Sequence, residues 1–348
     1  MAAQKNPHGG VAAFSVKLVL LLVCALGLRA HGQDDTGSVR NLSAEEVGRA
    51  LAVLRESHVD AASLDEQRMS RATLQGLVDL LAPGVVVTKE EKTKDEPSPF
   101  RSEILEGDIG YLRAGSMQTE NLAQLDAALR EFSEKKVTGV VLDLRATPDS
   151  PNFEVAAQMA QRFVPAGSPL FSLAGPQGQT TRDFKSAGPR LSDTVLVVVV
   201  DENTAGAAEA LAAALRSSAR ALLVGARTSG RCAEFVTVPL GGGNFLRYAA
   251  AAVRLPDGAD IYPRGLAPDI DVPQSSSDRE AVLMAAMTGG VGPLVFEKER
   301  ARLNEAALVA GTDPELAETS ETVMPLYDRP LQRAVDLVVA VRLFRGQD

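Results

Sequence analysis

The pattern of hydrophobic and polar positions changes character twice along this 348-residue chain. From Ser43 to Leu81 apolar residues recur at helical spacing, and a capping box of Ser43 and Glu46 predicts where this helical segment starts. Further along, short apolar runs alternate with amphipathic stretches, which is typical of strands that alternate with helices. Helical and loop character returns over residues 274–348 and includes an amphipathic helix predicted over residues 330–344.

The strongest strand signal is the unbroken apolar run Thr-Val-Leu-Val-Val-Val-Val over residues 194–200. Such a run is expected of a strand that is buried on both faces of a parallel sheet. Residues 248–253 are rich in Ala, so helix propensity alone favours a helix there. The other predicted strands are 109–112, 137–144 and 221–224, and the predicted helices between strands are 121–132, 151–163 and 204–216. This alternation predicts an α/β domain with a mostly parallel sheet.

Composition divides the chain into segments. A charged stretch with two prolines precedes the α/β region and is expected to be an exposed linker. No internal repeat is apparent. The expected segments are a signal peptide over 1–32, a helical segment over 43–88, the linker over 89–104, the core over 105–273 and a helical extension over 274–348.

Residues 1–32 have the features of a secretory signal. Lys5 precedes a mostly apolar stretch from Val11 to Leu28, and small residues follow near Gly32. The apolar stretch is short for a membrane span and a lysine interrupts it. We therefore expect an exported protein, periplasmic or secreted, with cleavage near Gly32; an uncleaved N-terminal membrane anchor is the alternative.

The chain is poor in reactive side chains. Its net charge of -9 argues against nucleic-acid binding, which needs clustered Lys and Arg. Cleavage near Gly32 would leave His58 and Cys232 as the only His and Cys. That pair cannot form an intramolecular disulfide or a zinc site with several His and Cys ligands, and we expect no cofactor and no metal. A His-dependent catalytic triad would have to use His58, which lies in the helical pattern near the N-terminus.

Four stretches of the core carry a resemblance. They are Gly-Tyr-Leu at 110–112, Val-Val-Leu-Asp-Leu-Arg at 140–145, Val-Val-Asp-Glu-Asn-Thr-Ala-Gly-Ala-Ala-Glu at 199–209 and Arg-Gly-Leu-Ala-Pro-Asp-Ile at 264–270. In this order and spacing they resemble the tail-specific, or C-terminal processing, family of serine peptidases. The resemblance covers residues 105–273 and implies a ClpP/crotonase-like core and Ser/Lys chemistry, in which a Lys amine takes the proton of an attacking Ser hydroxyl. The family commonly has a PDZ domain before the core, but the stretch between Leu81 and Gly107 is too short for one.

At the family's catalytic positions this sequence departs from the pattern. The position of the nucleophilic Ser holds Gly206, and that of the Lys base holds Arg231. Arg stays protonated in proteins and cannot take the proton of a Ser. The position of an auxiliary Asp holds Ser217.

The family's oxyanion loop, Asn-Asn-Pro-Gly-Gly, reads Ala-Thr-Pro-Asp-Ser over residues 146–150. Asp149 and Ser150 therefore replace two glycines. A carboxylate at Asp149 would oppose the stabilisation of an oxyanion if it faced the site. Four departures at registered positions predict a degenerate catalytic site.

Three residues next to these positions carry further expectations. Arg231 could lie on the surface, or it could form a buried ion pair with Asp149 or Glu209. Cys232 is expected to be a small buried hydrophobe rather than a nucleophile, although Arg231 could lower its pKa. Thr204 is expected to cap the helix that follows it.

We hypothesise a catalytically inactive pseudopeptidase that binds extended or C-terminal peptide segments of exported proteins at a sheet edge. One alternative is an active serine-type endopeptidase with a relocated nucleophile such as Ser229 or Cys232. The other is a structural subunit of an active paralogue. Homo-oligomerisation is left open.

Overall fold

The computed structural model describes residues 42–60, 64–89, 98–145, 147–295 and 326–345. The chain divides into two compact units, one that ends at Leu77 and one that begins at Val78. The expected signal peptide lies outside the described residues. No helix within the described ranges is long and apolar enough to span a membrane.

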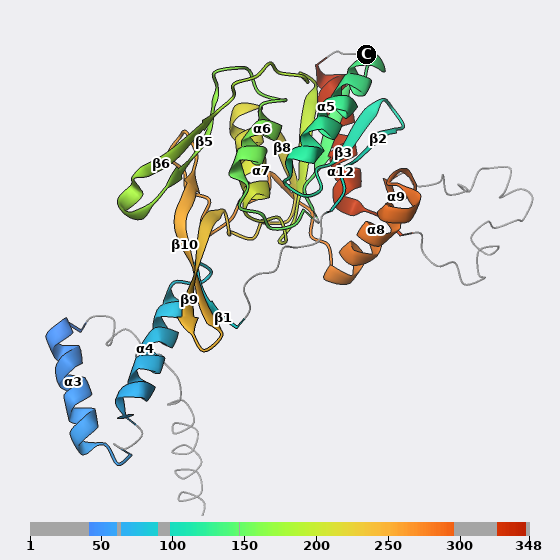
Figure 1. Ribbon diagram of the computed structural model, residues 1–348. Coiled ribbons are helices and arrows are strands. Elements are labelled where there is room, and N and C mark those ends of the chain that lie inside the picture. The colour runs from blue at the N-terminus through green and yellow to red at the C-terminus, as the bar shows by residue number, and fades with distance from the viewer. Residues whose placement is uncertain (1–41, 61–63, 90–97, 146, 296–325, 346–348) are drawn as a thin grey trace, which may run out of the picture. The chain divides into compact units, whose positions relative to one another are not determined.

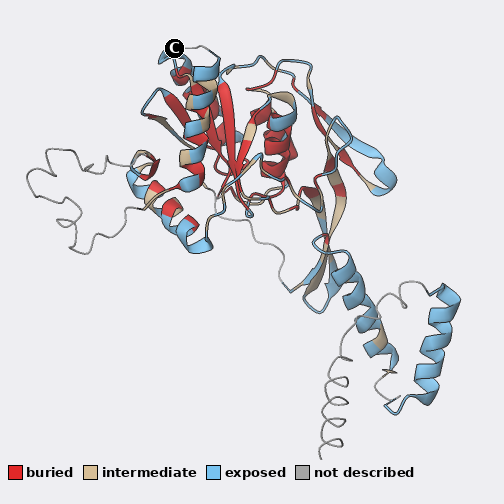
Figure 2. Ribbon diagram, turned by 180° about the vertical axis from the view of Figure 1, so that it is seen from behind, coloured by how far each residue is buried: buried red, intermediate tan, exposed pale blue. Residues whose placement is uncertain are grey.

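The first unit contains α3 (Ala44–Ser57) and most of α4 (Glu66–Leu80). The predicted capping box is confirmed: the Glu46 backbone N–H donates to Ser43 Oγ at 3.3 Å, and the Ser43 N–H donates to the Glu46 carboxylate at 2.7 Å. His58 is the C-cap of α3. Neither helix contains a buried residue, so both are drawn almost wholly as exposed in Figure 2.

The second unit is built on a six-stranded sheet, the parallel sheet, whose strands are parallel except for the pair β2–β3. β7 alternates between two cores: Leu196, Val198 and Val200 point to one, and Val195, Val197 and Val199 to the other. Burial on both faces explains the unbroken apolar run of this strand. In spatial order the strands are β11 (Ile270–Asp271), β8 (Leu222–Gly225), β7 (Val195–Val200), β4 (Gly139–Asp143), β3 (Ile109–Arg113) and β2 (Arg101–Leu105).

Helices cover both faces of the parallel sheet. One face packs against α5 (Thr119–Glu134), α6 (Phe153–Ala160) and α7 (Ala207–Ser218). The other face packs against α12 (Arg329–Phe344), with α8 (Ser276–Gly289) and α9 (Gly292–Val295) beside it. Figure 2 shows the buried residues gathered in the sheet and in the sides of the helices that face it. The α/β fold class predicted from the sequence, with a mostly parallel sheet and a C-terminal amphipathic helix, is confirmed.

A second sheet, the antiparallel sheet, was not predicted. It holds five strands, and α7 contacts both its strand β5 and β8 of the parallel sheet (Figure 1). Its spatial order is β1-β10-β5-β6, with β9 paired to β10. The bounds are β1 (Val85–Thr88), β5 (Pro169–Ala174), β6 (Thr180–Lys185), β9 (Ala233–Gly241) and β10 (Asn244–Arg254); a 3-10 turn, η2 (Pro176–Gly178), joins β5 to β6.

Two expectations from local pattern are corrected. The Ala-rich residues 248–253 lie in strand β10, because pairing with β9 on one side and with β1 and β5 on the other outweighs their helix propensity. The expected linker over 89–104 is shorter than proposed, since Arg101–Leu105 forms β2 and pairs with β3.

Candidate functional site

The turn after β7 leads into the position expected for the family's nucleophile. The Asp201 carboxylate accepts hydrogen bonds from the backbone N–H groups of Asn203 and Thr204, both at 3.0 Å, and from the Thr204 hydroxyl at 3.1 Å. Thr204 therefore closes this turn. The expectation that it caps α7 is wrong, because the N-cap of α7 is Gly206 and no side chain caps the helix.

Gly206 has a backbone conformation that few other residues adopt. Its φ of 57° lies in the left-handed region that favours glycine. Sharp, strained strand-to-helix turns of this kind present the nucleophile in many serine hydrolases. A Cβ at this position would lie 2.6 Å from Asp149 Oδ1 and 2.7 Å from the Ser150 carbonyl oxygen. The loop that carries Asp149 is thus packed directly onto Gly206, and the Ala207 N–H donates to that same carbonyl at 2.9 Å.

Arg231, at the expected base position, lies beside Asp149. Its Nε is 4.0 Å from Asp149 Oδ2, and its side chain is 43% exposed. Of the two partners considered for Arg231, the structure brings Asp149 close, but the pair is long and partly exposed rather than buried. Glu209 instead accepts hydrogen bonds from the Thr228 hydroxyl, the Ser229 hydroxyl at 3.1 Å and the Gly230 N–H at 2.8 Å. Burial raises the pKa of Glu209 above its usual value, and these hydrogen bonds oppose the rise.

A second arginine, which the sequence analysis missed, completes the cluster. Arg247 in β10 places its Nη2 3.9 Å from Asp149 Oδ2 and is 24% exposed. Its guanidinium lies 4.3 Å from the ring centroid of Phe235 in β9. The β9–β10 register pairs Arg247 with Thr237 and Phe235 with Ala249, which puts Arg247 diagonally across from Phe235. Only this register brings Arg247 to the site, and no local sequence signal marks it.

The remaining candidates differ in burial and in their contacts. Cys232 is fully buried, and burial raises its pKa well above the usual value, with the charges of Glu209 and Asp149 adding to the effect. The suggestion that Arg231 lowers the pKa of Cys232 is therefore wrong. Ser217 is exposed in the last turn of α7 and donates to the Ala214 carbonyl at 3.2 Å. Ser150 Oγ accepts from the Asn152 N–H at 3.2 Å.

A second charged cluster lies at the ends of the same parallel strands. Arg145 is 1% exposed and donates two hydrogen bonds to Asp328, at 2.9 and 2.7 Å, and two to Asp143, at 3.0 and 2.9 Å. The hydroxyl of Tyr111 also donates to Asp143, at 2.9 Å. Burial alone would raise the pKa of Asp143, but the charge and hydrogen bonds of Arg145 outweigh it and hold this pKa below its usual value.

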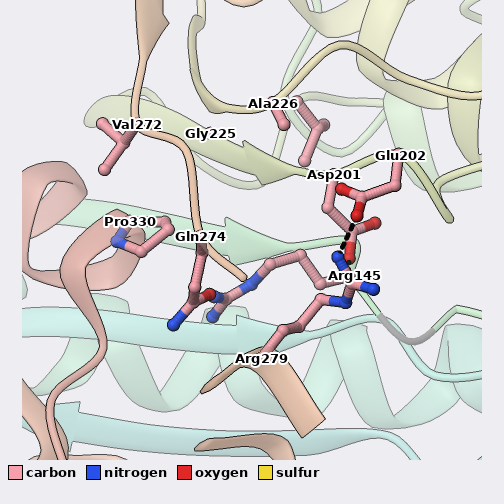
Figure 3. A pocket seen from close by; sticks show the side chains of 10 residues that line it. Arg145, Asp201, Glu202, Gly225, Ala226, Val272, Gln274, Arg279 and Pro330 are labelled. Atoms are coloured by element: carbon pink, nitrogen blue, oxygen red, sulfur yellow. Dashed lines mark hydrogen bonds and ion pairs between the residues drawn. The ribbon is translucent and has the colours of Figure 1, made fainter. Parts of the chain in front are cut away.

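A small pocket at Arg145 is also lined by the charged side chains of Asp201, Glu202 and Arg279, together with uncharged residues (Figure 3). Arg279 of α8 hydrogen-bonds to Glu202 and lies 3.5 Å from Asp201 Oδ2. These pairs join α8 and α12 to the parallel sheet, so we assign the cluster a structural role. Within the described ranges no group of three or more His, Cys, Asp or Glu is placed to hold a metal ion.

Comparison with known proteins matches residues 108–272 to Peptidase family S41. The chain is 34% identical over 166 residues to the chloroplastic C-terminal processing peptidase of Tetradesmus obliquus, covering 47% of this chain and 35% of that one. It is 30% identical over 174 residues to a carboxy-terminal-processing protease of Bartonella bacilliformis, covering 49% and 40%. Among solved structures, the photosystem II D1 C-terminal processing protease aligns with a TM-score of 0.44 and 28% identity, covering 52% of this chain and 49% of that one.

Residues 108–272 thus match Peptidase family S41, and the relatives named above are C-terminal processing peptidases. The family resemblance inferred from the four motifs is thereby confirmed. The chain spans 35–40% of the length of the two relatives named above.

Proposed function

We propose that this protein is a tail-specific peptidase homologue that forms no covalent intermediate with a peptide and instead binds extended or C-terminal peptide segments. The observation that carries the proposal is the packing at Gly206. The nucleophile position has no side chain, and the Asp149 carboxylate and the Ser150 carbonyl occupy the space that a side chain would need. Covalent catalysis acts as a unit, so loss of the nucleophile removes most of the rate enhancement.

The groups around Gly206 support the same proposal. The base position holds an arginine, a residue type that does not serve as a base in proteins. Asp149 puts a carboxylate within contact distance of the nucleophile position, where developing negative charge would be repelled. Two reactive side chains at the site, those of Cys232 and Glu209, are fully buried.

An open strand edge supports the peptide-binding part. Among the residues the structure describes, β9 pairs only with β10, so its other edge is free to accept an added strand. An extended peptide can join such an edge through backbone hydrogen bonds. The matched relatives are named as C-terminal processing proteases, and we extend to this chain only the binding of such segments.

A hydrolysis and retention assay tests the proposal. The full chain is incubated with a pool of random-sequence decapeptides; cleavage is followed by mass spectrometry and binding by retention on the immobilised protein. We expect retention without cleavage, in the natural protein and also in a Gly206→Ser/Arg231→Lys variant, because Asp149 and Ser217 remain unsuitable. Turnover by the natural protein that one nucleophile substitution abolishes would overturn the proposal.

One contact favours a second candidate, an active peptidase with Ser229 as nucleophile. The Ser229 hydroxyl donates to Glu209 at 3.1 Å, and a carboxylate that accepts from a hydroxyl is placed to act as its base. A fluorophosphonate probe followed by peptide mapping separates the two candidates. Stoichiometric labelling at Ser229 that Ser229→Ala abolishes and Ser217→Ala leaves unchanged supports the peptidase, whereas no labelling contradicts it.

We also propose that the protein is exported and that residues 1–32 are removed, leaving a helical segment, a short linker, the peptidase-like core and the C-terminal extension as its parts. The apolar stretch from Val11 to Leu28 supports export. N-terminal sequencing of the protein from its native host tests this. A new N-terminus near residue 33 supports cleavage, and an intact N-terminus in the membrane fraction indicates an uncleaved anchor instead.

A further inference from the structure

The two arginines at the Gly206 site have hydrogen-bonding capacity that the protein does not use. Within the described part of the chain, neither Arg231 nor Arg247 donates a side-chain hydrogen bond to a protein acceptor, and Arg231 Nε is itself buried without a partner. Their nearest anionic atom, Asp149 Oδ2, is 4.0 and 3.9 Å away, which is beyond hydrogen-bond distance. A guanidinium carries five N–H donors, so two guanidinium groups that lie near one carboxylate and donate no hydrogen bond to the protein can donate to a further acceptor.

Arg247 is held ready for such an acceptor. The ring of Phe235 packs against its guanidinium at 4.3 Å and limits the positions that this side chain can take. Burial of all but 24% of the side chain limits them further. A group fixed in this way loses little conformational entropy when a ligand binds.

The charge balance favours an anion. Two guanidinium groups share one nearby carboxylate, that of Asp149. Glu209 is the other acid close by, but its oxygens accept from Thr228, Ser229 and Gly230 and do not pair with either arginine. The planar guanidinium of arginine matches the geometry of a carboxylate and can donate two parallel hydrogen bonds to it.

We propose that Arg231 and Arg247 bind a carboxylate of the peptide ligand, either an Asp or Glu side chain or the C-terminal carboxylate. This inference rests on the proposed peptide-binding function and names the chemical group that the site takes. The bound carboxylate would then lie at the two guanidinium groups, beside the position of the family's Lys base and not at Gly206, where the Asp149 carboxylate lies. Asp149 keeps the two guanidinium groups together while leaving their donors open.

A small-molecule titration tests the carboxylate site without a peptide. The Nε–Hε signals of Arg231 and Arg247 in the full chain are followed by NMR as N-acetylglycine, or the uncharged N-acetylglycinamide, is added at low salt. We expect the chemical shifts of both signals to change when N-acetylglycine is added and to stay constant when N-acetylglycinamide is added. The control is Arg254, which lies in the same strand and is paired with Asp260 at 3.1 Å. No movement, or equal movement of Arg254, overturns the inference.

The decapeptide pool provides the second arm. We expect the natural protein to retain peptides with a carboxylate about tenfold better than uncharged ones, since a hydrogen-bonded charge contributes on that order. Arg231→Gln and Arg247→Gln should each remove this preference, while Arg254→Gln should keep it. Loss of the preference on C-terminal amidation assigns the bound group to the peptide terminus, and a lasting preference for Asp and Glu assigns it to a side chain.

The two arms separate the two proposals. Peptides that are retained with no preference for acids overturn the carboxylate site and leave peptide binding standing. A pool that is not retained at all overturns peptide binding, and the titration then decides the carboxylate site by itself.

Discussion

The segment that follows β4 contributes to two clusters of arginine and aspartate with opposite properties. In the first, Arg145 joins Asp143 and Asp328 through hydrogen bonds of 2.7–3.0 Å, and all three residues are at most 1% exposed. In the second, Arg231 and Arg247 lie 3.9–4.0 Å from Asp149, and their side chains are 43% and 24% exposed. Burial of a charge is costly unless the charge is paired and hydrogen-bonded, whereas a partly exposed guanidinium can donate to water or to a ligand. We infer that the first cluster serves the fold and the second serves binding.

The largest effect is expected from Asp328→Ala, which removes two of the four hydrogen bonds of buried Arg145. Removing one partner of a buried ion pair destabilises proteins by about 3–5 kcal/mol, and we expect a loss of that size in the free energy of unfolding. Urea denaturation measures it. As a control, Asp336→Ala on the exposed side of the same helix should change this free energy by less than about 0.5 kcal/mol. A loss below about 1 kcal/mol for Asp328→Ala would refute the structural assignment.

Gly206→Ser is expected to cost about 2–4 kcal/mol of unfolding free energy, because the new side chain meets Asp149 and Ser150 in addition to the strain of a positive φ. Gly107→Ser is the matched control, since Gly107 also has a positive φ, 78°, but open space where its Cβ would lie. Its cost should be about 1 kcal/mol, from the backbone alone. Calorimetry or urea unfolding measures both variants. If Gly206→Ser and Gly107→Ser lose the same unfolding free energy, the Asp149 loop moves aside without a penalty, which would weaken the proposal of a closed nucleophile position.

Glu209→Gln is expected to change how stability depends on pH. The folded-state pKa of Glu209 is raised above its ordinary 4.5, so as pH rises above 4.5 the unfolded chain loses this proton first and the folded state loses stability. The Gln variant has no such proton. The unfolding free energy of the natural protein should therefore fall relative to that of Glu209→Gln as pH rises through this range. Urea unfolding from pH 4 to 8 checks this fall, with Glu280→Gln as an exposed control. A difference in unfolding free energy between the natural protein and Glu209→Gln that does not change with pH would contradict the prediction.

The smallest effect is expected from Arg231→Gln, which should change the unfolding free energy by less than about 0.5 kcal/mol. Long, partly exposed ion pairs contribute little, so the substitution should weaken ligand binding without weakening the fold. Thermal and urea unfolding measure this together. A loss above about 2 kcal/mol would make Arg231 a structural residue like Arg145 and remove the contrast between the two clusters.

The four inner strands of the parallel sheet could be predicted from the sequence because each is a local apolar run, as could the helices with a local apolar stripe; the edge strands β2 and β11 are not apolar runs and were not predicted. The antiparallel sheet could not be predicted. The Ala-rich residues of β10 favour a helix by themselves and become a strand only through partners on both sides. Thr204 was misassigned for a related reason, since Asp201 engages its hydroxyl before the helix begins.

At the candidate site, Gly206, Arg231 and Asp149 could be found because they occupy registered positions within family motifs. In the structure, Asp149 lies close to both Gly206 and Arg231. Arg247 and Asp328 could not be found, because neither belongs to a motif and each reaches its partner through tertiary structure. Strand pairing brings Arg247 to Asp149, and a chain separation of 183 residues divides Arg145 from Asp328.

That separation has a consequence for biosynthesis. At a ribosomal rate of about 5–20 residues per second, roughly ten to forty seconds pass between the emergence of Arg145 and that of Asp328. During this interval the face of β7 formed by Val195, Val197 and Val199 lacks the helix that finally covers it. The nascent core therefore exposes both an apolar surface and an incompletely paired guanidinium until late in synthesis. We expect the nascent chain to depend on chaperones in that window, more than the compact finished core suggests.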